Sequence, residues 1–178
     1  RQNFGSAHDG RFFIDPGLLR EVEVLRGPAS SLYGSGGTGG VIAFRTVRAE
    51  DLLAADETVG VEVAAGYQTV NDEPAGTLTA FGRPSDGVDL IASVTRRTSG
   101  EIELGDGSTL DNVDDDILSA FAKATVALQD FHSLELSYTR FANDAQEPNN
   151  GQDPEGDNIV DKEIRSDTGR LLYSYKNP

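Results

Sequence analysis

The 178-residue sequence contains no Cys, no Met and no Trp, and it contains only two His. Without Cys the chain has no disulfide, no thiol nucleophile and no Cys-ligated zinc or iron–sulfur site. Because Met is absent and no signal peptide is recognisable, we interpret the sequence as an excerpt of a longer protein. Two isolated His residues do not form a nucleophile–base–orienter set, so we expect neither an enzyme nor a catalytic cofactor.

Basic residues are also scarce, since 15 Lys and Arg stand against 30 Asp and Glu, for a formal net charge of −15. Such an acidic surface repels phosphate backbones, so nucleic acid is disfavoured as a partner. No window reaches the roughly 18 to 20 consecutive apolar residues of a membrane-spanning helix. A transmembrane β-barrel is still compatible with the mean hydropathy of −0.38. Its strands need only about 9 to 11 residues of alternating polarity.

Residues 1–47 are rich in Gly and contain short apolar runs. A helical turn is predicted at residues 16–20, with Asp15 as N-cap and Pro16 at the first helical position. Strands are predicted at residues 22–26 and 41–44, with a further helical turn at 28–33 and a Gly-rich run between them. This pattern indicates a small mixed sheet. The Gly run matches the dinucleotide pattern G-x-G-x-x-G, but a strand follows it instead of a helix, which disfavours nucleotide binding.

Residues 59–178 alternate between apolar and polar or small side chains. The alternation predicts six strands, at residues 59–68, 77–81, 88–96, 118–128, 133–139 and 164–175. Short connections at one end and long loops at the other indicate an up-and-down meander, as in outer-membrane barrels. The alternative is a soluble antiparallel sheet with its apolar face on a core. Alternation alone does not separate the two.

The segment Val22-Glu-Val-Leu-Arg-Gly-Pro28, followed by Ser30-Ser-Leu-Tyr33 and Gly39-Gly-Val-Ile42, closely resembles the end of the plug domain of TonB-dependent receptors. Within that family the chain is most similar to the haem and haemoglobin group. This second similarity lies in Arg1-Gln2 with His8 and residues 13–16, in residues 44–53, and in residues 143–150.

The resemblance implies a mainly β fold in three parts. Residues 1–47 would be the C-terminal part of a small mixed α/β plug, and residues 48–58 the junction between plug and barrel. Residues 59–178 would form the first six strands of an antiparallel, up-and-down transmembrane β-barrel. An open sheet of six strands cannot close a barrel, so it would keep unpaired edges.

The resemblance also implies a function, which is TonB-dependent uptake of haem, either free or taken from haem proteins such as haemoglobin. The expected location is the outer membrane of a Gram-negative bacterium, with lipid around the barrel and the TonB complex as energy-transducing partner. His8 matches the family's plug histidine, an axial ligand of haem iron, and a barrel ligand would lie outside this sequence. Alternatives are a solvated loop role for His8, a siderophore or iron-chelate receptor, and a soluble β-rich binding or adhesion module.

Three other features have simpler interpretations. His132 shares its parity with Leu134, Leu136 and Tyr138, so we expect an interfacial, structural side chain near a short turn. Acidic residues gather at 111–116 and at 153–163. Calcium would suit their carboxylates, but the EF-hand order is missing and a solvated loop is favoured. The alternating tyrosines fit either membrane-interface girdles or ordinary strand positions; they are Tyr67, Tyr138, Tyr173 and Tyr175.

Overall fold

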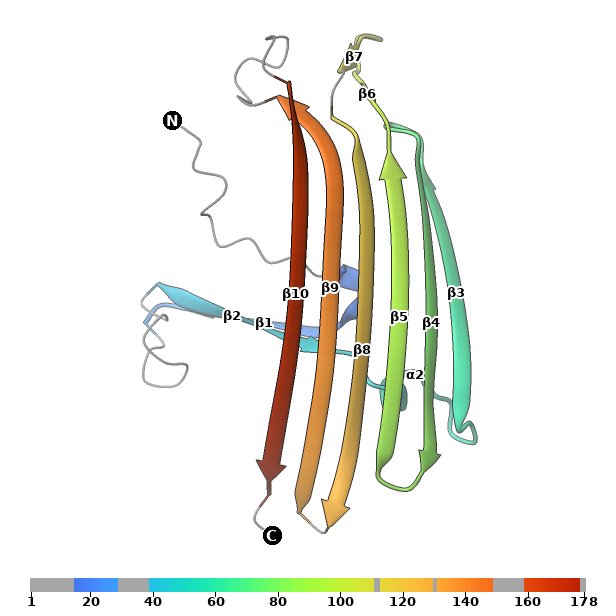
Figure 1. Ribbon diagram of the computed structural model, residues 1–178, viewed down its shortest axis with the longest axis vertical. Helices are drawn as coiled ribbons and strands as arrows, with labels where there is room; N and C mark the ends of the chain where they lie inside the picture. The colour runs from blue at the N-terminus through green and yellow to red at the C-terminus, as the bar shows by residue number, and fades with distance from the viewer. Residues whose placement is uncertain (1–14, 29–38, 111–112, 130, 149–158, 177–178) are drawn as a thin grey trace.

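The computed structural model describes residues 15–28, 39–110, 113–129, 131–148 and 159–176 (Figure 1). The described part is almost entirely β, as expected. Its elements, labelled as in Figure 1, are a 3-10 helix at Pro16–Leu18, β1 Leu19–Arg26, β2 Gly40–Thr46, α2 Ala49–Leu52, β3 Val59–Gln68, β4 Glu73–Ser85, β5 Val88–Ser99, β6 Ile102–Glu103, β7 Thr109–Leu110, β8 Asp115–Gln129, β9 His132–Pro148 and β10 Ile159–Tyr175. Among these residues no helix is long and apolar enough to cross a membrane.

The N-terminal part begins with the predicted helical turn. The Asp15 side chain accepts a hydrogen bond from the Gly17 N–H at 2.9 Å, and Pro16 occupies the first position, which confirms the cap. β1 and β2 pair as an antiparallel hairpin, from Leu19 opposite Thr46 to Arg26 opposite Gly40. Both predicted strands are therefore present. The helical turn predicted at 28–33 falls largely outside the described residues.

The larger sheet has six antiparallel strands in the order β10-β9-β8-β5-β4-β3. The short β4–β5 and β8–β9 turns lie at one end of the sheet, whereas β5 and β9 end, and β8 and β10 begin, at the other end (Figure 1). Asp86 and Gly87 form the two-residue β4–β5 turn, in which Gly87 has a φ of +82° that favours glycine. The meander predicted from the alternation is confirmed.

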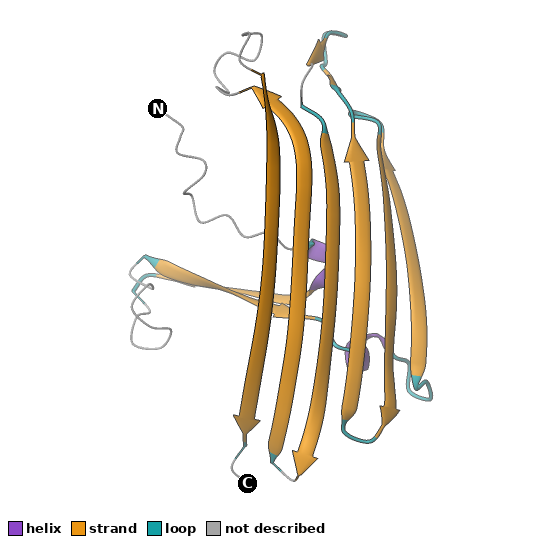
Figure 2. Cartoon of the chain, in the orientation of Figure 1, coloured by secondary structure: helices purple, strands orange, loops and turns teal. Residues whose placement is uncertain are grey.

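The two faces of this sheet differ in what covers them (Figure 2). The face that carries polar side chains is packed against the hairpin and α2, and Ser93, Thr95 and Lys123 are buried there. The apolar side chains lie on the opposite, open face, where Val61, Leu136 and Leu171 are 57–67% exposed. A soluble sheet buries its apolar face. This sheet has the reverse arrangement, which is that of a barrel wall.

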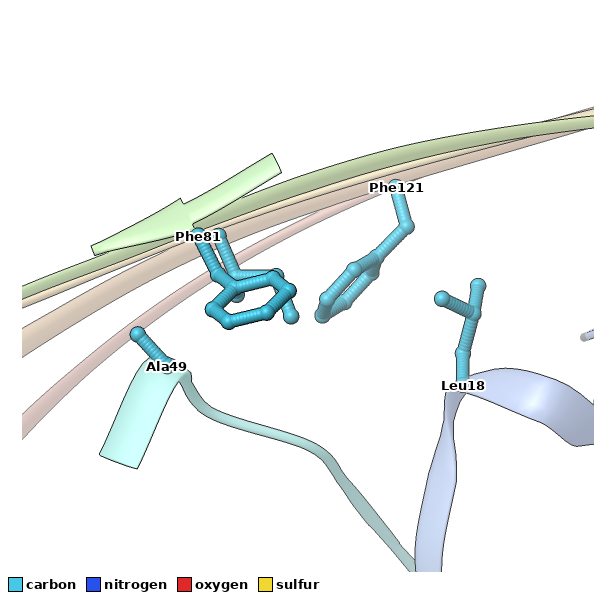
Figure 3. Close-up of a cluster of buried hydrophobic side chains, with 5 residues drawn as sticks. Leu18, Ala49, Phe81 and Phe121 are labelled. Carbon is cyan, nitrogen blue, oxygen red and sulfur yellow. The ribbon is translucent and has the colours of Figure 1, made fainter. Parts of the chain in front are cut away.

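The buried apolar cluster is small and lies between the sheet and the N-terminal part (Figure 3). It consists of Leu18 beside the hairpin, Ala49 in α2, and Phe81, Ile91 and Phe121 on the sheet. The ring of Phe81 lies over Gly60 on the neighbouring strand, where an added Cβ would be only 2.5 Å from it. Glycine at position 60 therefore makes room for the ring.

Candidate functional site

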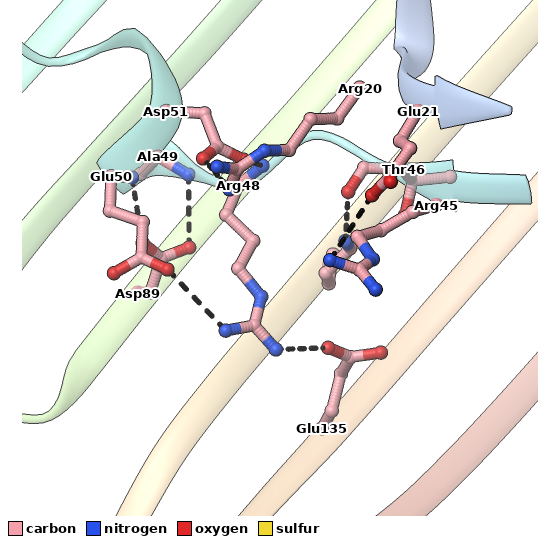
Figure 4. Close-up of polar contacts among 11 residues, drawn as sticks. Arg20, Glu21, Arg45, Thr46, Arg48, Ala49, Glu50, Asp51, Asp89 and Glu135 are labelled. Atoms are coloured by element: carbon pink, nitrogen blue, oxygen red, sulfur yellow. Dashed lines mark hydrogen bonds and ion pairs between the residues drawn. The ribbon is translucent and has the colours of Figure 1, made fainter. Parts of the chain in front are cut away.

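The contact between the N-terminal part and the sheet is made largely by charged side chains on the polar face. Three strands contribute one such residue each, namely Asp89 in β5, Lys123 in β8 and Glu135 in β9. The register sets Asp89 opposite Thr125, and Thr125 opposite Glu135. The carboxylates therefore lie in one row across the sheet, and Lys123 is two positions along its strand. All three reach residues 46–50 (Figure 4).

Asp89 binds the first turn of α2. Its two carboxylate oxygens accept hydrogen bonds from the Ala49 N–H at 3.0 Å and the Glu50 N–H at 2.9 Å (Figure 4). The first N–H groups of a helix have no partner within the helix, so an external acceptor satisfies them. Asp89 is only 8% exposed and Ala49 is fully buried, so water has little access to the Ala49 N–H as a substitute acceptor.

Arg48 joins the same helix to β9. Its guanidinium donates to the Glu135 carboxylate at 2.9 Å and to Glu50 at 3.5 Å, and its backbone N–H donates to Asp51 at 2.9 Å. Burial disfavours the cation, but the hydrogen bonds to Glu135 and Glu50 outweigh it, so the pKa of Arg48 is raised. A base with a raised pKa stays charged as the pH rises. Alkaline pH therefore does not release this contact through Arg48.

Two further contacts fix the ends of the hairpin. The Lys123 ammonium, 5% exposed, donates to the Thr46 carbonyl at 3.0 Å, at the end of β2. Arg20 in β1 forms an ion pair with Asp51 in α2. Polar contacts thus join both strands of the hairpin and the helix, and they tie residues 46–50 to three strands of the sheet.

A polar cavity of about 860 Å³ lies between the hairpin and strands β8 to β10. Its charged lining includes Arg45 from β2, Lys123 from β8 and Arg170 from β10. Glu135 also lines it and is shared, since one oxygen meets Arg48 and the other lies 3.6 Å from Arg170. This cavity can accommodate charged groups.

Residues 1–41 match the family model of the TonB-dependent receptor plug domain. The fold is similar to the FrpB iron transporter of Neisseria meningitidis. Against its F5-1 variant the TM-score is 0.81 at 25% identity, over 94% of this chain and 28% of that one. The resemblance to TonB-dependent receptors is confirmed. Because of this similarity we call the β1–β2 pair the plug hairpin and the six-stranded sheet the barrel wall.

Curated relatives extend the similarity over most of the chain. A hemin receptor of Yersinia enterocolitica is 38% identical over 152 residues, which are 85% of this chain and 22% of the relative. A heme/hemopexin utilization protein C of Haemophilus influenzae is 36% identical over 143 residues, which are 79% of this chain and 20% of the relative. The chain therefore spans about a fifth of the length of these relatives.

The predicted haem ligand, His8, lies outside the described residues, so its role stays a prediction. His132 lies at the start of β9, beside the short β8–β9 turn, as the alternation predicted. Its Nδ1 is 2.6 Å from the Tyr173 hydroxyl, and its ring centroid is 4.9 Å from that of Tyr175. These contacts fit a structural side chain at the rim of the barrel.

The acidic loops fall partly outside the described residues, at 111–112 and 149–158. In the part of the chain that the structure describes, no group of three or more His, Asp or Glu could hold a metal ion. Asp89 and Glu135 bind residues 48–50 in the structure, but no pattern in the sequence indicated either residue. Each is a single carboxylate in an alternating strand, and its partner is 40 or 87 residues away.

Proposed function

We propose that the protein containing this chain takes up haem across the outer membrane of a Gram-negative bacterium in a TonB-dependent manner. The observation that carries the proposal is the 38% identity to a hemin receptor, which extends over 85% of this chain. The match to the plug-domain model supports dependence on TonB. Haem is the transported ligand, and haem proteins such as haemoglobin are its expected sources.

In this proposal residues 1–47 belong to the plug, residues 48–58 are the junction, and residues 59–178 belong to the barrel. The open face supports a membrane location, because its apolar side chains end at polar pairs on the long-loop side. These pairs are Arg96 with Asp116 and Tyr138 with Asp167. At the short-turn side Tyr173 and Tyr175 are each 56% exposed. Aromatic side chains at both limits of an apolar band are typical of outer-membrane barrels.

We further propose that His8 is one axial ligand of the haem iron and that a barrel residue outside this sequence is the other. A neutral imidazole nitrogen is a standard ligand of haem iron. The match to the plug-domain model, which includes residue 8, and the similarity of the chain to hemin receptors support this assignment. Transport would follow when the TonB complex, driven by the inner-membrane proton gradient, remodels the plug.

The test is a haem titration of the full-length receptor in detergent, followed by visible absorption. His8→Ala is compared with wild type, and His132→Ala is the matched control because it removes the chain's other imidazole. We expect His8→Ala to weaken haem binding by about tenfold or more, which corresponds to about 1.4 kcal/mol, and to change the spin state. His132→Ala should bind haem as wild type does.

Two results would contradict these proposals in different ways. Wild type that binds no haem would reject haem as the ligand. Saturable haem binding that is indifferent to His8→Ala would retain haem and reject the ligand role of His8.

A second candidate function is uptake of a siderophore or another iron chelate. The similarity in fold to an iron transporter, with a TM-score of 0.81, favours it. In that case His8 would have no role in the ligand site. Growth on a ferric chelate, without growth on haem, would favour this candidate.

A further inference from the structure

The cavity between the plug hairpin and the barrel wall holds an unusual share of the positive charge of the chain. Six of the 15 basic residues line it, against five of the 30 acidic residues. The chain as a whole has a net charge of −15. Anions are therefore repelled by most of this protein but not by this cavity.

The cavity extends along the barrel wall toward the short-turn end. Thr139 and Thr168, which pair with each other, line it at one limit, and Lys176 lines it at the other. Lys176 follows Tyr175, which pairs with His132 at the start of β9. Seven residue steps separate positions 132 and 139, so this stretch of wall is about 24 Å long. Short turns of outer-membrane barrels face the periplasm. The cavity thus lies on the exit side of the plug hairpin.

The cations in this cavity keep donors for another anion. Arg170 is 61% exposed and lies 3.6 Å from Glu135, a carboxylate that it shares with Arg48. Arg45 is 70% exposed and is paired with an exposed Glu21 at 3.2 Å. A guanidinium has five N–H donors, so each of these side chains keeps N–H groups for an entering carboxylate.

We propose that this cavity is an anion-binding vestibule, in which Arg170, Lys176 and Arg45 hold the carboxylates of the ligand during its exit to the periplasm. The inference depends on the proposed function, because haem carries two propionate carboxylates. The vestibule would be a second, weaker binding site for the ligand, on the far side of the plug from the long loops. It would affect the rate at which the ligand leaves the receptor and not the affinity of the first binding step.

The experiment compares haem with haem dimethyl ester, which lacks free carboxylates, in the full-length receptor. The test variant is Arg170→Gln with Lys176→Gln. The control is Arg140→Gln with Arg165→Gln, which removes the same charge from the opposite, open face of β9 and β10. Uptake into cells is measured at saturating ligand, and equilibrium binding is measured in detergent.

We expect wild type to import haem faster than the ester. The test variant should import haem roughly three to five times more slowly, the effect of losing one or two exposed charge contacts. Its uptake of the ester and its affinity for haem should be unchanged, and the control variant should resemble wild type.

Other outcomes would contradict the proposal that this cavity binds anions. Haem uptake at the wild-type rate in the test variant would show that these cations do not contact the ligand. An equal loss of haem and ester uptake would show that the substitutions act on structure alone. A wild-type receptor that binds no haem would reject the proposed function itself, whereas haem uptake that is indifferent to the substitutions would reject only the vestibule.

Discussion

Asp89 in β5 accepts hydrogen bonds from two backbone N–H groups of α2, although it lies about 40 residues farther along the chain. Asp89→Ala leaves both groups without an acceptor, and a buried unsatisfied donor costs about 1 to 3 kcal/mol. We expect amide hydrogen exchange at Ala49 and Glu50 to accelerate by about tenfold or more in the full-length receptor.

Asp89→Asn is the graded control, because it retains one acceptor oxygen, and it should give an intermediate rate. Unchanged exchange in Asp89→Ala would show that this carboxylate does not hold the helix.

Gly60 leaves space for the Phe81 ring, which packs over it. An added Cβ would lie 2.5 Å from the Phe81 ring, so Gly60→Ala must displace the ring from the buried cluster. Overpacking of this kind costs about 1 to 3 kcal/mol. We expect a lower thermal unfolding temperature for the receptor in detergent.

Gly66→Ala is the matched control on the same strand, since nothing lies within 4 Å of a Cβ at that position. If Gly60→Ala and Gly66→Ala have the same unfolding temperature, the Phe81 ring does not pack over Gly60.

The residues whose positions could be predicted are those whose contacts are local in sequence. Asp15 accepts a hydrogen bond from Gly17, two residues away, so its role as N-cap is predictable. The position of His132 follows from the alternation of its own strand. Asp89 and Glu135 act on residues far along the chain. Their roles depend on strand order and register, which a single sequence does not specify.

At the scale of elements, the alternation located every strand of the barrel sheet but not the strand ends. β4 was predicted at 77–81 and extends over Glu73–Ser85, and β9 was predicted at 133–139 and extends over His132–Pro148. Ladder hydrogen bonds join backbone groups, so pairing continues beyond the apolar residues that produce the pattern. The four-residue helix α2 was not predicted, because Asp89 stabilises it from outside.

Neighbouring positions on β9 test the assignment of the two faces. Leu136 lies on the open face and is 57% exposed, whereas Ser137 lines the polar cavity. Leu136→Lys should lower the amount of folded receptor recovered from the outer membrane, because a Lys facing lipid costs about 2 to 4 kcal/mol near the midplane.

Ser137→Lys adds the same side chain on the inner face and should be tolerated. Equal yields of the two variants would contradict the assignment of lipid to the open face.

At the scale of the whole molecule, the sheet ends in two edges, β3 and β10, with unpaired backbone groups. Such edges pair with other chains, and lipid does not satisfy them. We therefore expect residues 1–178 produced alone to associate, and the full-length receptor to be monodisperse in the same detergent. Size-exclusion chromatography distinguishes these outcomes, and a monodisperse 178-residue chain would contradict the prediction.

The alternation predicted the six-stranded meander, whereas the choice of a barrel over a soluble sheet came from the resemblance. Period-two alternation shows that a strand has two faces, but it does not show which face is covered. In the structure the polar face is the covered one, because the plug hairpin packs on it through Lys123 and the buried cluster. His8 lies outside the described residues, so the ligand site stays a prediction.

The length of the connection between β2 and β3 limits how far the plug hairpin can move from the barrel wall. Residues 47–58 link the plug hairpin to the barrel, and twelve extended residues span at most about 40 Å. The exposed apolar stretch of β9, from residue 132 to 138, is only about 20 Å long. While Asp89 and Glu135 bind residues 48–50, most of the 47–58 segment cannot extend between the hairpin and the sheet. If these contacts, the Lys123 contact and the buried cluster were all released, the linker would let the hairpin move farther than the length of that stretch while it stays joined to β3.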